Sequence, residues 1–260
     1  MTLVVVGVGA MGSALAARLV ERGHDVVGVD PFLAAAGSAV ETAEGVRVVH
    51  SLEDVDAAVS EVLVFVRMAD QVVSVIESMD GLRAYDDVPA TILSTLSPAD
   101  ARSVAERFGA GRRIVEAPVS GGVSGARLGA LTVLMAGEPG AWLADAAATV
   151  FRFDGFGLPA AAKLLNNSLA AANAHALTAA LAQADGLGLD AAQMLEVVRV
   201  SSGGGWIAEN FDEFPVDLLW KDFTLLQASG PVTFPATDGR TDLVEAVRNS
   251  RRRIAPEERN

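Results

Sequence analysis

Cysteine is absent from the 260-residue sequence, and histidine is nearly so. The lack of cysteine excludes disulfides, thiolate nucleophiles and cysteine-based zinc sites. The three histidines, His24, His50 and His175, have no metal-ligand spacing such as HExxH. We therefore expect no metal site.

Long apolar runs are also missing. Three glycines interrupt the apolar start of the chain, no basic leader precedes it, and no eighteen consecutive residues are all apolar. The sequence thus predicts neither a signal peptide nor a membrane-spanning helix. Apolar residues still make up 51% of the chain, which is enough to bury a core. We expect a folded cytoplasmic protein with no membrane partner.

Positive charge is scarce. The chain has 33 acidic and 20 basic residues, a formal net charge of −13, so a nucleic-acid backbone would be repelled. Lysine is the rarest charged residue. The chain has only Lys163 and Lys221, compared with eighteen arginines. Arginine keeps its proton under physiological conditions, whereas the pKa of a lysine falls readily on burial. The two lysines are therefore candidate acid/base groups.

The first half of the chain alternates short apolar runs with amphipathic helical patterns, which is typical of a parallel sheet with crossover helices. Strands are predicted over residues 3–6, 26–29, 46–49, 62–66, 91–93, 113–115 and 131–135. Helices are predicted over 11–22, 98–108 and 139–150, with Ser97 as the N-cap of the second.

The pattern becomes wholly helical after residue 157. From Pro159 the chain predicts one unbroken helix to Gly186 or Gly188, about 40 Å long, and then helices over 191–200, 206–211 and 216–229. We expect an α/β Rossmann domain over 1–157, followed by a smaller all-helical domain over 158–260, the two joined by the long helix. Residues 230–260 are atypical, since Pro231, Pro235 and Gly239 break the helical pattern and arginines 251–253 follow, and we expect a partly disordered, solvated tail there.

A glycine-rich turn follows the first predicted strand and opens a helix. Its sequence is Gly7-Val8-Gly9-Ala10-Met11-Gly12, a GxGxxG in the strand–turn–helix context of a dinucleotide-binding site. Asp30, eighteen residues after Gly12, ends the second strand, where an acid binds ribose hydroxyls and repels a 2′-phosphate. The turn predicts NAD in preference to NADP, although FAD and S-adenosylmethionine proteins share it.

Two further groups of residues can do hydroxy-acid chemistry. Lys163 and Asn167 stand at i and i+4 on the long helix, on one face and about 6 Å apart. A lysine of lowered pKa there can remove a hydroxyl proton while hydride leaves the same carbon. Ser120, Gly121 and Gly122 form a turn rich in N–H and O–H donors, suited to a substrate carboxylate.

These groups belong to motifs that resemble one family. The segment from Glu116-Ala117-Pro118-Val119-Ser120-Gly121-Gly122 to Leu131 resembles the substrate-binding signature of the β-hydroxyacid dehydrogenases. Gly157 through Lys163-Leu164-Leu165-Asn166-Asn167 resembles their catalytic helix, and Trp220-Lys221-Asp222-Phe223 their later KD motif. The matches run from residue 1 to about 228. Residues 64–71 and 206–210 are most similar to the L-threonate dehydrogenase branch.

The resemblance implies a role for each residue. Lys163 would be the general acid/base, Asn167 its partner and Ser120–Gly122 the carboxylate clamp, with Trp206 as a wall of the substrate site. Thr95 would contact the cofactor near the nicotinamide, and Lys221 would reach the cofactor or substrate. The other cofactor contacts would be Gly7, Gly9, Ala10, Met11, Gly12, Asp30, Val66, Arg67 and Met68. A small hydroxy acid would be the substrate, and the chain would form a homodimer or higher homo-oligomer.

Several departures keep other interpretations open. Pro159 replaces a family glycine, and Gly203–Gly205 supply no hydroxyl before Trp206, where threonate-type relatives often have serine. An imine reductase is one alternative, although such relatives usually carry aspartate or tyrosine in place of the lysine. A non-catalytic NAD-binding relative with an incomplete C-terminal domain is another. Trp206 could equally be a core residue, and His175 is expected to be structural.

Overall fold

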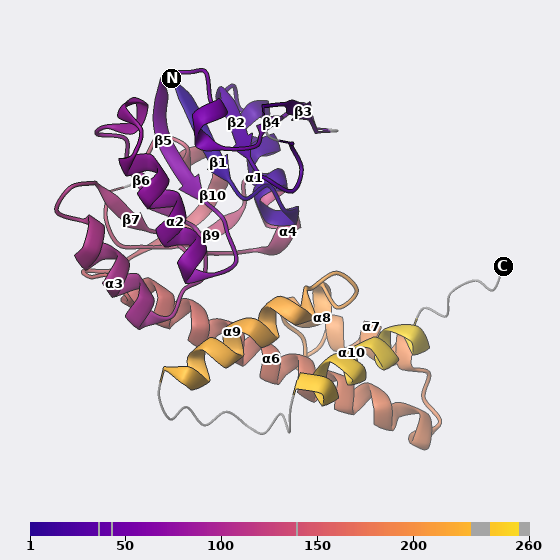
Figure 1. The fold of residues 1–260 in the computed structure, drawn as a ribbon. Coiled ribbons are helices and arrows are strands. Elements are labelled where there is room, and N and C mark those ends of the chain that lie inside the picture. Colours follow the sequence, from indigo (N-terminus) through magenta and orange to yellow (C-terminus); the bar gives the residue numbers. More distant parts are fainter. Residues whose placement is uncertain (36, 43, 139, 230–239, 255–260) are drawn as a thin grey trace. The chain divides into compact units, whose positions relative to one another are not determined.

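A computed structural model describes residues 1–35, 37–42, 44–138, 140–229 and 240–254 (Figure 1). The chain divides into two compact units, Met1–Lys163 and Leu164–Asn260. The division falls inside helix α6 (Leu158–Ala184), the long helix predicted from Pro159. The predicted α/β class, with a Rossmann-type sheet before a helical region, is confirmed.

The sheet of the first unit has seven strands within the described residues, in the order β3-β4-β2-β1-β5-β6-β7. All pairs are parallel except β3 with β4. The strands are β1 (Thr2–Val6), β2 (Val26–Val29), β3 (Ala39–Glu41), β4 (Arg47–Val49), β5 (Val59–Val64), β6 (Ala90–Ile92) and β7 (Ile114–Glu116). The order reverses at β1, and in such sheets ligands bind beyond the carboxyl ends of the strands at that point.

Apolar side chains on both faces of the sheet hold it between helices. Leu3 and Val5 of β1 join one core cluster, while Val4 and Val6 join the other, as expected for a strand buried on both faces. Helix α1 (Ala10–Glu21) contributes to the first cluster; α2 (Ala69–Asp80) and α3 (Pro98–Phe108) contribute to the second. The predicted N-cap of α3 is confirmed, because Ser97 Oγ accepts a hydrogen bond from the Asp100 amide.

A second, three-stranded sheet in the same unit differs from the prediction. It has the order β10-β9-β8, with β8 (Val119–Ser120), β9 (Leu131–Met135) and β10 (Ala147–Arg152). The strand predicted over 131–135 is therefore in place but outside the main sheet. The prediction of a helix over 139–150 is wrong for the residues that the structure describes. Only the short helix α5 (Leu143–Ala146) forms there, and the residues after it pair with β9. Residue 139 lies outside the described residues. Cross-strand pairing thus overrides the local helical preference of the alanines.

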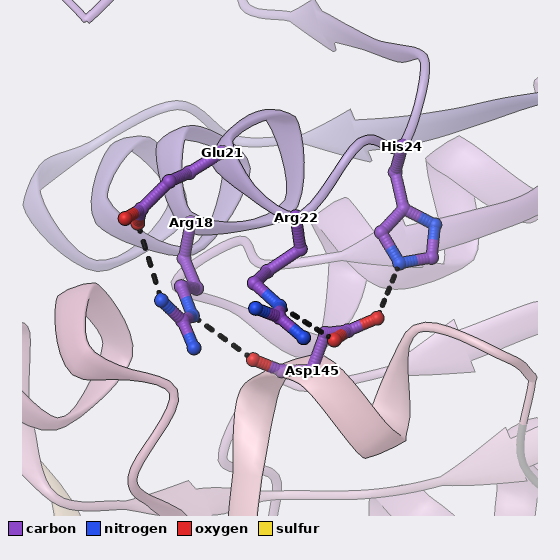
Figure 2. A network of polar contacts seen from close by, with 5 residues as sticks. All are labelled: Arg18, Glu21, Arg22, His24 and Asp145. Carbon is purple, nitrogen blue, oxygen red and sulfur yellow. Dashed lines mark hydrogen bonds and ion pairs between the residues drawn. The ribbon is translucent and has the colours of Figure 1, made fainter.

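A polar network ties the short helix α5 to α1 (Figure 2). Arg22 Nε donates to Asp145 Oδ1 at 2.8 Å, and His24 Nε2 lies 2.9 Å from Asp145 Oδ2. Arg18 Nε donates to the Asp145 carbonyl oxygen at 3.1 Å and also pairs with Glu21. Hydrogen bonding to Arg22 is the largest cause that holds the pKa of Asp145 below its usual range.

The described residues of the second unit form helices joined by loops, with no strand among them. Its helices after α6 are the 3-10 turn Asp185–Leu187, α7 (Ala191–Arg199), α8 (Trp206–Glu209), α9 (Val216–Ala228) and α10 (Arg240–Ile254). The first unit also has the helix α4 (Gly122–Leu128) and 3-10 turns over Leu52–Asp54 and Arg83–Tyr85. The three helices predicted after the long one are confirmed as α7, α8 and α9. Their core includes Leu177, Leu195, Phe211, Phe214 and Leu219.

Helix α10 corrects the expectation of a solvated arginine tail. Residues 230–239 and 255–260 lie outside the described residues, but the segment between them is a helix in which Val244 and Val247 are buried. Arg251 donates to the carbonyl oxygens of Phe211 and Phe214, both at 2.9 Å, and burial lowers its pKa. Val244, Val247 and Arg251 are spaced to share one helix face. The segment is mostly polar, so its sequence does not indicate this buried face.

Candidate active site and cofactor groove

The glycine-rich turn joins β1 to α1. A Cβ atom at Gly12 would lie 2.0 Å from the carbonyl oxygen of Gly7, so only glycine permits this close packing of helix on turn. A Cβ at Gly9 would meet no atom within 4 Å, so the backbone there is open to a ligand. The Ala10 and Met11 amides begin α1, where helix geometry leaves N–H groups without an intrahelical acceptor. The turn can therefore hold an anionic group at a helix N-terminus.

A groove of about 670 Å³ adjoins this turn in the first unit. Its lining includes Gly9, Ala10 and Ser13 from the turn and α1, Glu44 from the loop after β3, and Arg127 from α4. Arg127 Nη2 donates to Glu44 Oε1 at 3.1 Å, and α1 and α4 lie side by side (Figure 1). The volume is that of a typical small-molecule site. The open backbone and this groove fit a dinucleotide.

Asp30 lies directly beside the glycine turn. Its Oδ2 accepts a hydrogen bond from the Val8 amide at 3.0 Å, and its Oδ1 accepts one from the Phe32 amide at 2.9 Å. A carboxylate thus stands at the end of β2, where the spacing from Gly12 predicts it.

The other predicted cofactor residues follow the ends of β5 and β6. Val66 donates its amide to Ser94 Oγ at 2.9 Å, which ties the two loops together. Arg67 and Met68 are exposed, and both of their amides donate to Gln71 Oε1 at the start of α2. Thr95 is half-buried after β6. Because β1, β5 and β6 are parallel neighbours, these loops and the glycine turn follow the same edge of the sheet.

Lys163 and Ser120 meet within the first unit. The lysine is only 7% exposed, and its Nζ donates a hydrogen bond to Ser120 Oγ at 2.8 Å. Ser120 ends β8, and Gly121 and Gly122 lead directly into α4. The structure therefore brings together the predicted acid/base and the first residue of the predicted carboxylate clamp.

A buried carboxylate that the sequence reasoning did not single out holds the start of α6. Glu116 ends β7, is 2% exposed, and accepts hydrogen bonds from the Gly157 amide at 2.6 Å and the Ala160 amide at 2.8 Å. Burial raises the pKa of Glu116, and the two amide bonds oppose that rise. Its place at the head of the serine–glycine motif was the available signal.

In the second unit, Asn167 is paired with an acid. Asn167 is 9% exposed and donates Nδ2 to Asp222 Oδ2 at 2.6 Å; Asp222 is 3% exposed. Asn166 Nδ2 donates to Asn167 Oδ1 at 3.2 Å, and Lys221 Nζ lies 3.1 Å from Asp222 Oδ1. Asp222 was also not predicted as a site residue, although its place after Lys221 in the KD motif could have suggested it.

The second unit also contains Trp206 and His175, whose roles the sequence leaves open. Trp206 begins α8 with 43% of its surface exposed, so it is not a core residue. His175 is half-buried on α6. Across the described ranges, no three histidine, aspartate or glutamate side chains gather as a metal-ligand set, and no helix there has the length and apolarity to cross a membrane.

Comparisons with known proteins agree with this geometry. Residues 2–152 match the NAD-binding domain of 6-phosphogluconate dehydrogenase, and residues 157–251 match the NAD-binding model of NADP-dependent 3-hydroxyisobutyrate dehydrogenase. The chain is 34% identical over 221 residues to a probable 3-hydroxyisobutyrate dehydrogenase of Mycobacterium tuberculosis, covering 79% of this chain and 71% of that one. It is 31% identical to the 3-hydroxyisobutyrate dehydrogenase of Pseudomonas aeruginosa, covering 80% and 72% of the two chains.

Solved structures give the same result. The chain is similar to 3-hydroxyisobutyrate dehydrogenase of Mycobacterium tuberculosis in a structure with L-serine, at a TM-score of 0.71 and 26% identity over 96% of this chain and 92% of that one. It is also similar to the enzyme of that name from Salmonella typhimurium, at a TM-score of 0.76 and 25% identity over 96% and 93% of the chains. The chain therefore belongs to the β-hydroxyacid dehydrogenase family and is an NAD(P)-dependent hydroxyacid dehydrogenase.

Proposed function

We propose that the enzyme uses NAD to oxidise a small 3-hydroxy acid, with Lys163 as the general acid/base. The observation that carries this proposal is the hydrogen bond of 2.8 Å between Lys163 Nζ and Ser120 Oγ, made by a lysine that is almost fully buried. Buried lysines with a polar partner are suited to proton transfer near neutral pH.

Each side chain of the proposed site has a separate role. Neutral Lys163 accepts the hydroxyl proton of the substrate and returns it when the reaction runs in reverse. Ser120 Oγ, with the amides of Gly121 and Gly122, binds the substrate carboxylate. Asn167 binds the reacting hydroxyl together with Lys163, held in orientation by Asp222. Bound NAD would supply the hydride acceptor.

The residues proposed to hold the cofactor are those of the glycine turn and the sheet edge. The Gly9–Gly12 segment binds the pyrophosphate, and Asp30 binds the adenosine ribose. Val66, Arg67, Met68 and Thr95 line the path toward the nicotinamide. Lys221 reaches the cofactor or substrate, and Trp206, since it is exposed, is available as a wall of the substrate site. Residues 1–157 form the NAD-binding domain in this proposal, and 158–260 the substrate domain.

The helical domain is also proposed to join copies of the chain as a homodimer or larger homo-oligomer in the cytoplasm. Leu165 and Leu169 on α6 are 47% and 53% exposed, and no charged residue occurs from there to the end of the helix. An apolar surface of this kind favours burial against a partner. Light scattering tests the assembly, with a mass above 26.8 kDa expected, and cell fractionation tests the location.

The substrate is to be found with a panel of 3-hydroxyisobutyrate, D-glycerate, L-threonate and 4-hydroxybutyrate, following NADH formation. Relatives named for 3-hydroxyisobutyrate and L-threonate support the inclusion of these two compounds. We expect turnover of a 3-hydroxy acid. Binding of NAD without turnover of any compound would favour the non-catalytic alternative. Reduction of cyclic imines with NADPH would favour the imine reductase.

A further inference from the structure

We propose that Glu116 is a positioning residue that fixes Lys163 through the first turn of helix α6. The proposal rests on the proposed role of Lys163. It adds a residue that contacts neither substrate nor cofactor and acts only through the backbone of the helix that carries the lysine.

Glu116 contacts the start of α6 directly. Both carboxylate oxygens of Glu116 are used: Oε2 accepts from the Gly157 amide at 2.6 Å, and Oε1 accepts from the Ala160 amide at 2.8 Å. Amides in the first turn of a helix lack intrahelical acceptors, and a carboxylate there also complements the helix dipole. Two bonds from one side chain fix the position and the direction of the helix start.

The path from this contact to the amine of Lys163 is short. Lys163 follows Ala160 by three residues, so it lies one helical turn further along. Its Nζ bonds Ser120, which follows Glu116 by only four residues. The segment 116–120 therefore holds Lys163 at two points, through the helix N-terminus and through the amine. A shift of the helix start would move Nζ away from Ser120.

The carboxylate of Glu116 is buried, away from water. Glu116 is 2% exposed, and the guanidinium of Arg102 is the charged group whose field acts on it. A buried carboxylate that loses its partners is costly. An ordinary helix cap could be supplied by a serine or aspartate at the N-cap position, yet here a side chain from a strand of the sheet reaches across. The arrangement joins the helix to the sheet edge where the cofactor loops lie.

The test uses the two lysines of the chain. Full-length protein labelled with ¹³C-lysine gives two Cε resonances, and Lys221→Arg assigns them. The variants are Glu116→Gln, which keeps the shape but replaces one acceptor by a donor, and Glu116→Asp, which keeps the charge. Glu61→Gln is the matched control, because Glu61 is also a buried carboxylate of the first unit (4% exposed) whose pKa burial raises. Its partners are Thr91 of β6 and Trp142, neither of which is a proposed cofactor or substrate residue.

We expect Glu116→Gln to shift the Lys163 Cε resonance and its titration midpoint, and to lower kcat about tenfold or more with NAD affinity within about twofold. Glu116→Asp should change the Lys163 resonance and kcat less than Glu116→Gln does. Glu61→Gln should change neither the resonance nor kcat, even where it lowers the melting temperature. If the Lys163 resonance and kcat are unchanged in Glu116→Gln and Glu116→Asp, the proposal is overturned. A shifted resonance in a protein that turns over no hydroxy acid supports the positioning role while contradicting the proposed function.

Discussion

Asn167 and Asp222 form a buried pair in which the amide Nδ2 donates to the carboxylate Oδ2 at 2.6 Å. The pair joins α6 to α9 in the helical unit. It also fixes which way the amide of Asn167 is turned, because Oδ1 accepts from Asn166 on the other side. An amide held on both sides presents a defined surface to a ligand.

Replacing Asp222 by alanine removes the acceptor of this buried amide. We expect a loss of about 1–3 kcal/mol in the free energy of unfolding, since an unsatisfied buried donor costs that much. We also expect a fall of about tenfold in kcat/KM, because Asn167 is no longer held. Urea denaturation and steady-state kinetics measure both. Gln227→Ala, at an exposed position of the same helix, is the control and should change neither.

Arg112 is expected to be the most important arginine for the stability of the first unit. It is 8% exposed, donates to the carbonyl oxygens of Tyr85 and Val88 at 2.7 and 2.6 Å, and pairs with Asp80. Arg112→Ala leaves these acceptors unpaired and should cost about 3 kcal/mol.

The control for that experiment is Arg107→Ala. Arg107 pairs with Glu77 on the surface, where both side chains are about half exposed, and an exposed ion pair contributes about 0–1 kcal/mol. Urea unfolding curves of the two variants should separate clearly. Equal losses would show that burial of Arg112 contributes little.

The network around Asp145 makes stability depend on pH. Its pKa in the folded protein is lowered, first by the hydrogen bond from Arg22 and next by that from His24. The stabilisation is therefore present above the ordinary aspartate pKa of 3.8 and is lost as the pH falls through the lower, folded value. The wild-type protein should have a higher melting temperature than Asp145→Asn at pH 7, and this difference should disappear in acid. A melting-temperature difference that persists unchanged at the lowest pH would contradict this. Glu106→Gln, at an exposed position of α3, serves as the control.

Asp30 is expected to set the preference for NAD. A carboxylate beside the glycine turn repels a 2′-phosphate. Asp30→Asn should therefore lower the ratio of the NADP dissociation constant to the NAD dissociation constant by about tenfold or more. Asparagine keeps one oxygen to accept from the Val8 amide and replaces the oxygen that accepts from the Phe32 amide by a donor. Titration of both dinucleotides measures the ratio. An unchanged ratio would refute the assignment to the ribose.

The sequence predicts the main sheet well because its strands are apolar on both faces and its glycine turn has a fixed spacing. The second sheet escapes such reasoning. β10 (Ala147–Arg152) contains two alanines, and its strand state comes from pairing with β9, a contact that local pattern does not contain. The antiparallel β3 has only three residues, all exposed, so it lacks the apolar run of a strand buried on both faces.

At the site, helical spacing places Lys163 and Asn167 correctly on the long helix, whereas Ser120, expected in a turn, is the last residue of β8. Motif and spacing do not reveal Glu116 or Asp222 as partners. Each of these acids lies more than forty residues along the chain from the group it bonds, and such pairs depend on the packed fold. Arg251 was missed for the same reason, since its acceptors are carbonyl oxygens in another segment.

The most direct test of the account is the turnover of Lys163→Ala with the best hydroxy acid of the panel. We predict that kcat falls by about 10²–10⁴-fold, the usual contribution of a general acid/base, while the dissociation constant of NAD stays within about twofold of the wild-type value. A Lys163→Ala enzyme with wild-type kcat would contradict the proposed mechanism.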